Sequence, residues 1–113
     1  KSHRDTVARF VRATQRAYLE CVKNGRPCIE ALVAASSGQD LQVQLDQWER
    51  VKELMSDNYA RTFALGAFDP KRMEADYELI EKYFKLDKPY DVKAAYTNEM
   101  LDRSIKMPEV KAR

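Results

Sequence analysis

Hydrophobic residues recur at helical spacing from the start of the chain. Between positions 2 and 24 they follow one another at intervals of three and four, while arginines and a lysine take the opposite face. The repeating positions are Val7, Phe10, Val11, Thr14, Ala17, Tyr18, Cys21 and Val22. This pattern predicts an amphipathic helix over 2–24, with Ser2 and Asp5 as a capping box and Asn24-Gly25 as a left-handed stop.

Three more helices are predicted downstream. Pro27 suits the first turn of a second helix that ends at 36–38, and Asp40 can cap a third that runs past Met55. Asp69-Pro70 then begins a fourth helix, which ends near Leu86. The apolar positions of these helices include Ile29, Leu32, Leu45, Trp48, Val51, Met73, Tyr77, Ile80 and Phe84.

The segment between the third and fourth helices is apolar but not periodic. Its aromatic residues Tyr59, Phe63 and Phe68, together with the flexible run 65–67 (Leu-Gly-Ala), either fill the gap between those helices or line a ligand cleft, and filling is the favoured interpretation. Downstream, Asp91 can cap a brief turn through residue 96, and Thr97 or Asn98 another through residue 105. We therefore expect a helical subdomain over 1–106 and a loose tail over 107–113.

No segment alternates apolar and polar residues as a strand does, so the predicted fold is all-α. Short connections favour antiparallel packing of the four helices. The expected core comprises Phe10, Tyr18, Leu32, Leu45, Trp48 and Ile80.

Composition narrows the class of protein. The 113 residues suit one domain, and 44% hydrophobic with 34% charged residues is typical of a chain that folds or docks. The net charge is +2, with both signs interspersed, so neither nucleic acid nor an anionic membrane is an expected partner. The basic stripe Arg9, Arg12 and Arg16 and the carboxylates Glu74, Asp76, Glu78 and Glu81 are interpreted as solvated faces.

Candidate chemistry is sparse. Cys21 and Cys28 allow one disulfide or two free thiols, and the single histidine, His3, lies near the chain start. A four-ligand zinc site and a serine–histidine–acid triad therefore lack residues, and no cofactor is expected. No nucleophile, base and orienting group form a set, so the chain is not expected to be an enzyme.

Six motifs in order carry a family resemblance. They are the run 7–14 (Val-Ala-Arg-Phe-Val-Arg-Ala-Thr), the run 31–34, the Trp48 helix, the run 65–72, the run 86–89 and the run 96–101. Together they resemble the C-terminal helical part of the periplasmic substrate-binding proteins for nitrate, sulfonates, taurine and thiamine pyrimidines, which serve ABC importers. The resemblance covers residues 6–107, nearly the whole chain.

The resemblance implies a two-lobed α/β parent of which this chain forms a helical segment. Such a parent captures a small molecule for ABC-transporter import, docks on the importer's membrane subunits, and is periplasmic or lipid-anchored outside the cytoplasm. It assigns no ligand-contacting residue to this sequence, because the ligand is bound mainly by the upstream part. A severed helical segment is expected to self-associate or to swap helices through its open apolar surface. The alternative is a free-standing helical protein-interaction module.

Overall fold

A computed structural model describes residues 2–111, which form five α-helices and one 3₁₀ turn. The helices are α1 (Arg4–Lys23), α2 (Gly25–Ala35), α3 (Leu41–Met55), α4 (Asn58–Thr62) and α5 (Pro70–Tyr83), and the 3₁₀ turn is η1 (Val92–Ala94). No strand is present in this part of the chain. The predicted all-α class is therefore confirmed.

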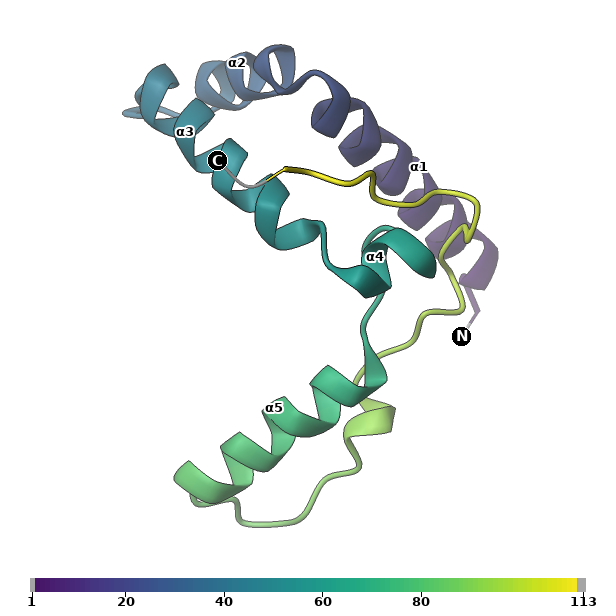
Figure 1. Cartoon of the computed structure of the whole chain (residues 1–113). Helices are drawn as coiled ribbons and strands as arrows, with labels where there is room; N and C mark the ends of the chain where they lie inside the picture. Colours follow the sequence, from purple (N-terminus) through teal and green to yellow (C-terminus); the bar gives the residue numbers. More distant parts are fainter. Residues whose placement is uncertain (1, 112–113) are drawn as a thin grey trace.

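The helices divide into a body and an arm. In the body, α2 packs against both α1 and α3, whereas α5 packs on η1. Figure 1 shows α5 projecting away from α1, α2 and α3, while the final residues run back across the body. The predicted packing of four antiparallel neighbours is thus wrong for the last long helix, because α5 makes its main contacts with the turn that follows it. Below, the α5 arm denotes residues 70–90.

Aspartates begin most of these elements. The side chain of Asp40 accepts a hydrogen bond from the Val43 amide at 2.9 Å. Asp69 and Asp91 accept from the amides two residues ahead, each at 3.0 Å. These bonds satisfy amides that have no partner inside the helix. The three predicted caps are confirmed, and Asp57 provides a further one for α4, which the sequence pattern did not indicate.

The ends of α1 differ from expectation. His3 occupies its N-cap position without a side-chain hydrogen bond, so the predicted capping box of Ser2 and Asp5 is wrong. Asn24 is extended, with φ −144°, and Gly25 already begins α2. The predicted left-handed stop is therefore wrong as well, because the chain turns through extended backbone and resumes a helix at once.

Gly25 has a packing role in place of the predicted turn role. A Cβ atom at this position would overlap Nε1 and Cδ1 of the Trp48 indole. The indole Nε1 also donates a hydrogen bond of 3.2 Å to the carbonyl of Cys21, so the ring is fixed on both sides. The absence of a side chain at Gly25 is what lets α3 approach the α1–α2 corner.

We expect Gly25→Ala to lower the free energy of unfolding by about 1–3 kcal/mol, as overpacking does in a fixed core. In a Trp48→Ala background the overlap is absent, and alanine has the higher helix propensity. The same substitution should then be neutral or stabilising. Urea unfolding of the four chains of this cycle measures both effects, and an equal cost in both backgrounds would contradict the role assigned to the glycine.

The C-terminal segment closes the body. The Leu65 amide donates to the Ile105 carbonyl at 2.9 Å, and the Met107 amide donates to the Ala60 carbonyl at 3.0 Å. The side chain of Met107 is 3% exposed. The loose tail predicted from residue 107 is therefore wrong as far as residue 110, since Val110 also packs against the core. Residues 112 and 113 lie outside the described part of the chain.

The predicted brief turn from Thr97 or Asn98 is present, since the Thr97 hydroxyl accepts a hydrogen bond of 3.2 Å from the Glu99 amide, but it does not continue to residue 105. This segment consists of turns and bends without helix. Its backbone bonds are partly local, from the Leu101 amide to the Asn98 carbonyl and from the Ile105 amide to the Asp102 carbonyl, and partly distant, from the Leu65 amide to the Ile105 carbonyl.

The core differs in membership from the prediction and includes Trp48. Its buried members are Val22, Ile29, Trp48, Ala60, Leu65, Ile105 and Met107, and Leu45 packs against them. Four predicted core residues are exposed instead: Phe10 by 72%, Tyr18 by 47%, Leu32 by 46% and Ile80 by 43%. Their spacing is that of a buried helical face, but no other segment of the described chain covers them.

This open packing gives the chain an unusually large surface. The accessible area is 8750 Å², whereas a folded monomer of this mass exposes about 6,400 Å². The radius of gyration is 16.8 Å, against about 13 Å for a chain of this length packed as one globule. The chain therefore leaves apolar area without a partner from its own residues.

Candidate functional site

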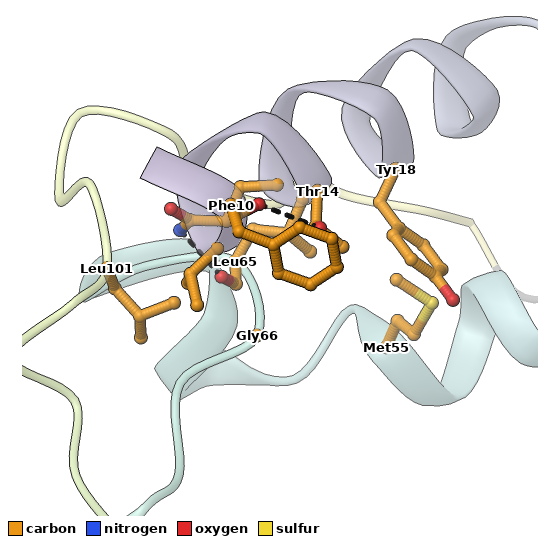
Figure 2. A pocket seen from close by; sticks show the side chains of 9 residues that line it. Phe10, Thr14, Tyr18, Met55, Leu65, Gly66 and Leu101 are labelled. Carbon is orange, nitrogen blue, oxygen red and sulfur yellow. Dashed lines mark hydrogen bonds between the residues drawn. The ribbon is translucent and has the colours of Figure 1, made fainter. Parts of the chain in front are cut away.

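An apolar groove runs along α1 and is the candidate site. Its first hollow, of about 320 Å³, lies between α1 and the segment that links α3 to α5. Figure 2 shows Phe10 and Tyr18 extending from α1, with Met55, Gly66 and Leu101 around the same space. We call this hollow the Phe10 hollow.

Gln15 fixes the floor of the Phe10 hollow. Its side chain is 4% exposed, and its Nε2 donates to the Leu65 carbonyl at 2.9 Å and to the Asp102 carbonyl at 3.3 Å. Its Oε1 accepts a bond of 2.8 Å from the Asp102 amide. A buried amide with such partners avoids the cost of an unpaired polar group. One side chain thereby joins α1 to two segments distant in sequence.

A second hollow, of about 250 Å³, continues the groove past Tyr18. Its walls come from α1, α2 and the Trp48 ring, and it lies directly beside the two cysteines. Tyr18 lines both hollows, and its ring centroid is 6.4 Å from that of Trp48. The two hollows adjoin at Tyr18, and we call them together the α1 groove.

Cys21 and Cys28 form a disulfide, with their Cα atoms 5.9 Å apart. Of the two alternatives left open by the sequence, the structure has the bridge, which joins the last turn of α1 to the first turns of α2. Disulfides of this kind are typical of oxidising compartments outside the cytoplasm. Among residues 2–111, no helix has the length and apolar character needed to cross a membrane.

Reduction of this disulfide is expected to lower the free energy of unfolding by about 2 kcal/mol, because the bridge closes a short loop and restricts the unfolded chain. The measurement is urea unfolding with and without dithiothreitol. A Cys21→Ser/Cys28→Ser chain should match the reduced protein and show no response to the reductant. Equal stability of oxidised and reduced protein would contradict the expectation.

The α1 groove is an apolar binding surface. Its walls are almost entirely apolar, and Gln15, the buried polar side chain among them, already has its hydrogen-bond partners. Across residues 2–111, no three histidine, cysteine, aspartate or glutamate side chains are close enough together to hold a metal ion. Such a lining suits apolar side chains of a partner.

Asp102, whose backbone is hydrogen-bonded to Gln15, has a perturbed carboxylate. Hydrogen bonds from the hydroxyl and the amide of Ser104 hold the pKa of Asp102 below its usual value, and the charges of Arg12 and Arg16 lower it further. Because the folded pKa is lowered, the linked stabilisation is present above the ordinary carboxyl pKa. It is lost as the pH falls through the lowered value.

We expect Ser104→Ala to raise the pKa of Asp102 toward its usual value without fully restoring it. The substitution removes the hydroxyl bond of 2.6 Å but leaves the amide bond of 2.9 Å and the two arginines. Carboxyl ¹³C chemical shifts followed through an acid titration give the pKa directly. Arg12→Gln should cause a smaller rise, and a larger rise there would contradict this ranking of causes.

Of the other predicted cleft residues, Leu65 and Gly66 line the Phe10 hollow, whereas Tyr59, Phe63 and Phe68 line neither hollow of the groove. Tyr59 and Phe63 stack with centroids 5.0 Å apart, and Arg103 lies 4.1 Å from the Phe63 centroid. The residues of this segment that fill space are Ala60, Ala64 and Leu65, which are buried in the body. The carboxylates of α5 are exposed, as are the three arginines of the basic stripe.

The groove could not be predicted from the sequence, because the hydrophobic spacing indicates a buried face of α1 that differs from the observed one. The face that contacts the body includes Val11, Gln15, Leu19 and Val22, whereas Phe10 and Tyr18 lie beside it. Gln15 was the available signal, since it lies four residues from both Val11 and Leu19. A polar residue at that position indicates either a helix face in water or a buried hydrogen-bonding group.

Comparison with protein-family models, with curated proteins and with solved structures gives no match to this chain.

Proposed function

We propose that this chain is a docking segment, the helical C-terminal part of a solute-binding protein that serves an ABC importer. The observation that carries the docking role is the set of exposed apolar side chains, in a chain whose total accessible area is about 2,400 Å² larger than that of a folded monomer of this mass. The assignment to the nitrate, sulfonate, taurine and thiamine-pyrimidine group rests on the six ordered sequence motifs alone.

In this proposal the α1 groove faces a lobe of the parent protein. The side chains that the sequence pattern places in a core, such as Phe10, Tyr18 and Leu32, are exposed here and would become buried against that lobe. The parent would capture a small solute and deliver it to the membrane subunits of the importer, without catalysis. The helical body would stiffen the lobe, so that closure on the solute is a hinge motion.

The disulfide supports a location outside the cytoplasm. Cys21 and Cys28 are bridged next to Trp48, where a reducing cytosol would keep two thiols. We therefore place the parent in the periplasm or on a lipid anchor outside the cytoplasm. A free copy of the chain would cover its open face by self-association.

A second candidate function is a free-standing helical module whose groove takes a partner helix. The α1 groove favours this candidate as much as it favours a segment of a larger protein, because both need an apolar surface for docking. The two differ in chain size and compartment.

An antibody raised against this chain separates the two candidates. Periplasmic and cytoplasmic fractions of the source cell are blotted after osmotic shock, with a known marker protein for each compartment. A periplasmic band well above 13.1 kDa is the expected result. A 13.1 kDa band in the cytoplasm would overturn the solute-binding assignment and support the free-standing module.

A further inference from the structure

The α5 arm carries a second apolar surface that the body does not cover. Its exposed fractions are 54% at Leu79, 69% at Tyr83 and 67% at Phe84, and Tyr90 near its end is 54% exposed. Leu79 and Tyr83 are four residues apart, as are Ile80 and Phe84, so these side chains form one helical stripe. An amphipathic helix with such a stripe normally lies against another surface.

Contacts at its root hold the arm away from the body. The side chain of Asn98 donates to the Phe68 carbonyl at 2.8 Å and accepts from the Phe68 amide at 2.9 Å. The rings of Phe68 and Tyr96 lie 5.3 Å apart. At the far end, the Tyr77 hydroxyl accepts a bond of 2.9 Å from the Tyr90 amide. The arm is therefore preset in its extended position, which lowers the entropy cost of docking.

The α1 groove matches the arm in size and in charge. The 14 residues of α5 span about 21 Å, and the stretch of α1 from Phe10 to Cys21 that lines the groove spans about 17 Å. Within α1 there are five basic and two acidic residues, whereas α5 holds four acidic residues and three basic ones, two of which lie in its first turn. Opposite charges at the margins of an apolar contact favour encounter and fix its register.

We propose that two copies of this chain exchange arms, each α5 arm lying in the α1 groove of the other copy. One chain carries both the groove and the stripe, so a two-fold pair covers both surfaces at once, which a partner of another kind would not do. The excess exposed area of about 2,400 Å² per chain is well above the roughly 800 Å² per partner that a stable interface buries. This pairing concerns the 113-residue chain and does not depend on the solute-binding assignment.

Light scattering and sedimentation between 1 and 100 µM, values chosen as about the usual range of protein association, test the pairing. We expect a particle of twice 13.1 kDa at the upper concentration. Leu79→Glu should raise the dissociation constant at least about tenfold, because it brings a carboxylate into an apolar groove. Val43→Glu is the matched control, since Val43 is 55% exposed and Leu79 is 54% exposed in the free chain.

Cross-linking tests the register. A Phe10→Cys chain is mixed with a Leu79→Cys chain and treated with a short bismaleimide, which does not react with the native disulfide. We expect a covalent pair of the two variants, and no such pair when Val43→Cys replaces Leu79→Cys. A monomer at 100 µM, taken as about the upper end of the tested range, would overturn the proposal. So would equal weakening by the two glutamate variants, or equal cross-linking of the two cysteine pairs.

Discussion

Replacing Trp48 by alanine is expected to lower the free energy of unfolding by about 3–5 kcal/mol, the range for removing a large aromatic side chain from a core. The ring is 9% exposed and lies against Gly25, which has no side chain to fill the space left behind. The substitution also removes the donor for the Cys21 carbonyl. Two costs therefore add, the lost apolar contact and the lost hydrogen bond.

Leu54→Ala provides the comparison for that measurement. Leu54 lies on the same helix, α3, but is 79% exposed, so its truncation should change the free energy of unfolding by no more than about 0.5 kcal/mol. Urea unfolding followed by far-ultraviolet circular dichroism suits both variants, because it does not depend on tryptophan fluorescence. A loss below about 1 kcal/mol for Trp48→Ala would mean that the ring is not the centre of the core.

The second large effect is expected at Gln15. Leucine has a similar size but no polar atoms, so Gln15→Leu leaves the Asp102 amide and the Leu65 carbonyl without their partner. Each buried polar group left unpaired costs about 1–3 kcal/mol, and we expect a total loss of about 2–4 kcal/mol. The free energy of unfolding of Gln15→Glu should lie between those of the unsubstituted chain and of Gln15→Leu. The glutamate keeps an acceptor for the Asp102 amide but loses the donor.

Hydrogen exchange locates the effect of Gln15→Leu. The amide of Asp102 should exchange faster by a larger factor than amides in α2, because Gln15 Oε1 is its partner. Gln44→Leu is the matched control, as the side chain of Gln44 on α3 makes a solvent-exposed hydrogen bond to the side chain of Gln39. If Gln15→Leu and Gln44→Leu lower the free energy of unfolding by the same amount, Gln15 does not join α1 to the C-terminal segment.

Much of the local structure follows from short-range signals. Helix starts at Asp40 and Asp69 were predictable because a cap needs only an aspartate and amides two or three residues ahead. The role of Gly25, at the junction of α1 and α2, was not predictable in the same way. The glycine there serves a contact with Trp48, 23 positions later, and nothing in its neighbourhood indicates that contact.

The long-range arrangement was less accessible from the sequence. Apolar spacing in α1 indicates which residues avoid water but not which partner covers them, so Phe10 and Tyr18 were assigned to a core that does not reach them. The same limit applies to Ile80 in α5. The C-terminal segment was missed for a different reason, because its order comes from backbone bonds to residues 60 and 65 and not from a periodic pattern of its own.

The paired bonds between Phe68 and Asn98 make the arm a detour in the chain path. The polypeptide leaves the body at residue 68 and returns to the same point at residue 98, so the ends of the excursion are already side by side. A detour of this kind can lengthen, shorten or change its sequence while the body keeps its own contacts. Variation among relatives of this chain is therefore expected to concentrate between those two residues, in the length of the arm and at positions outside the apolar stripe that docks on the α1 groove.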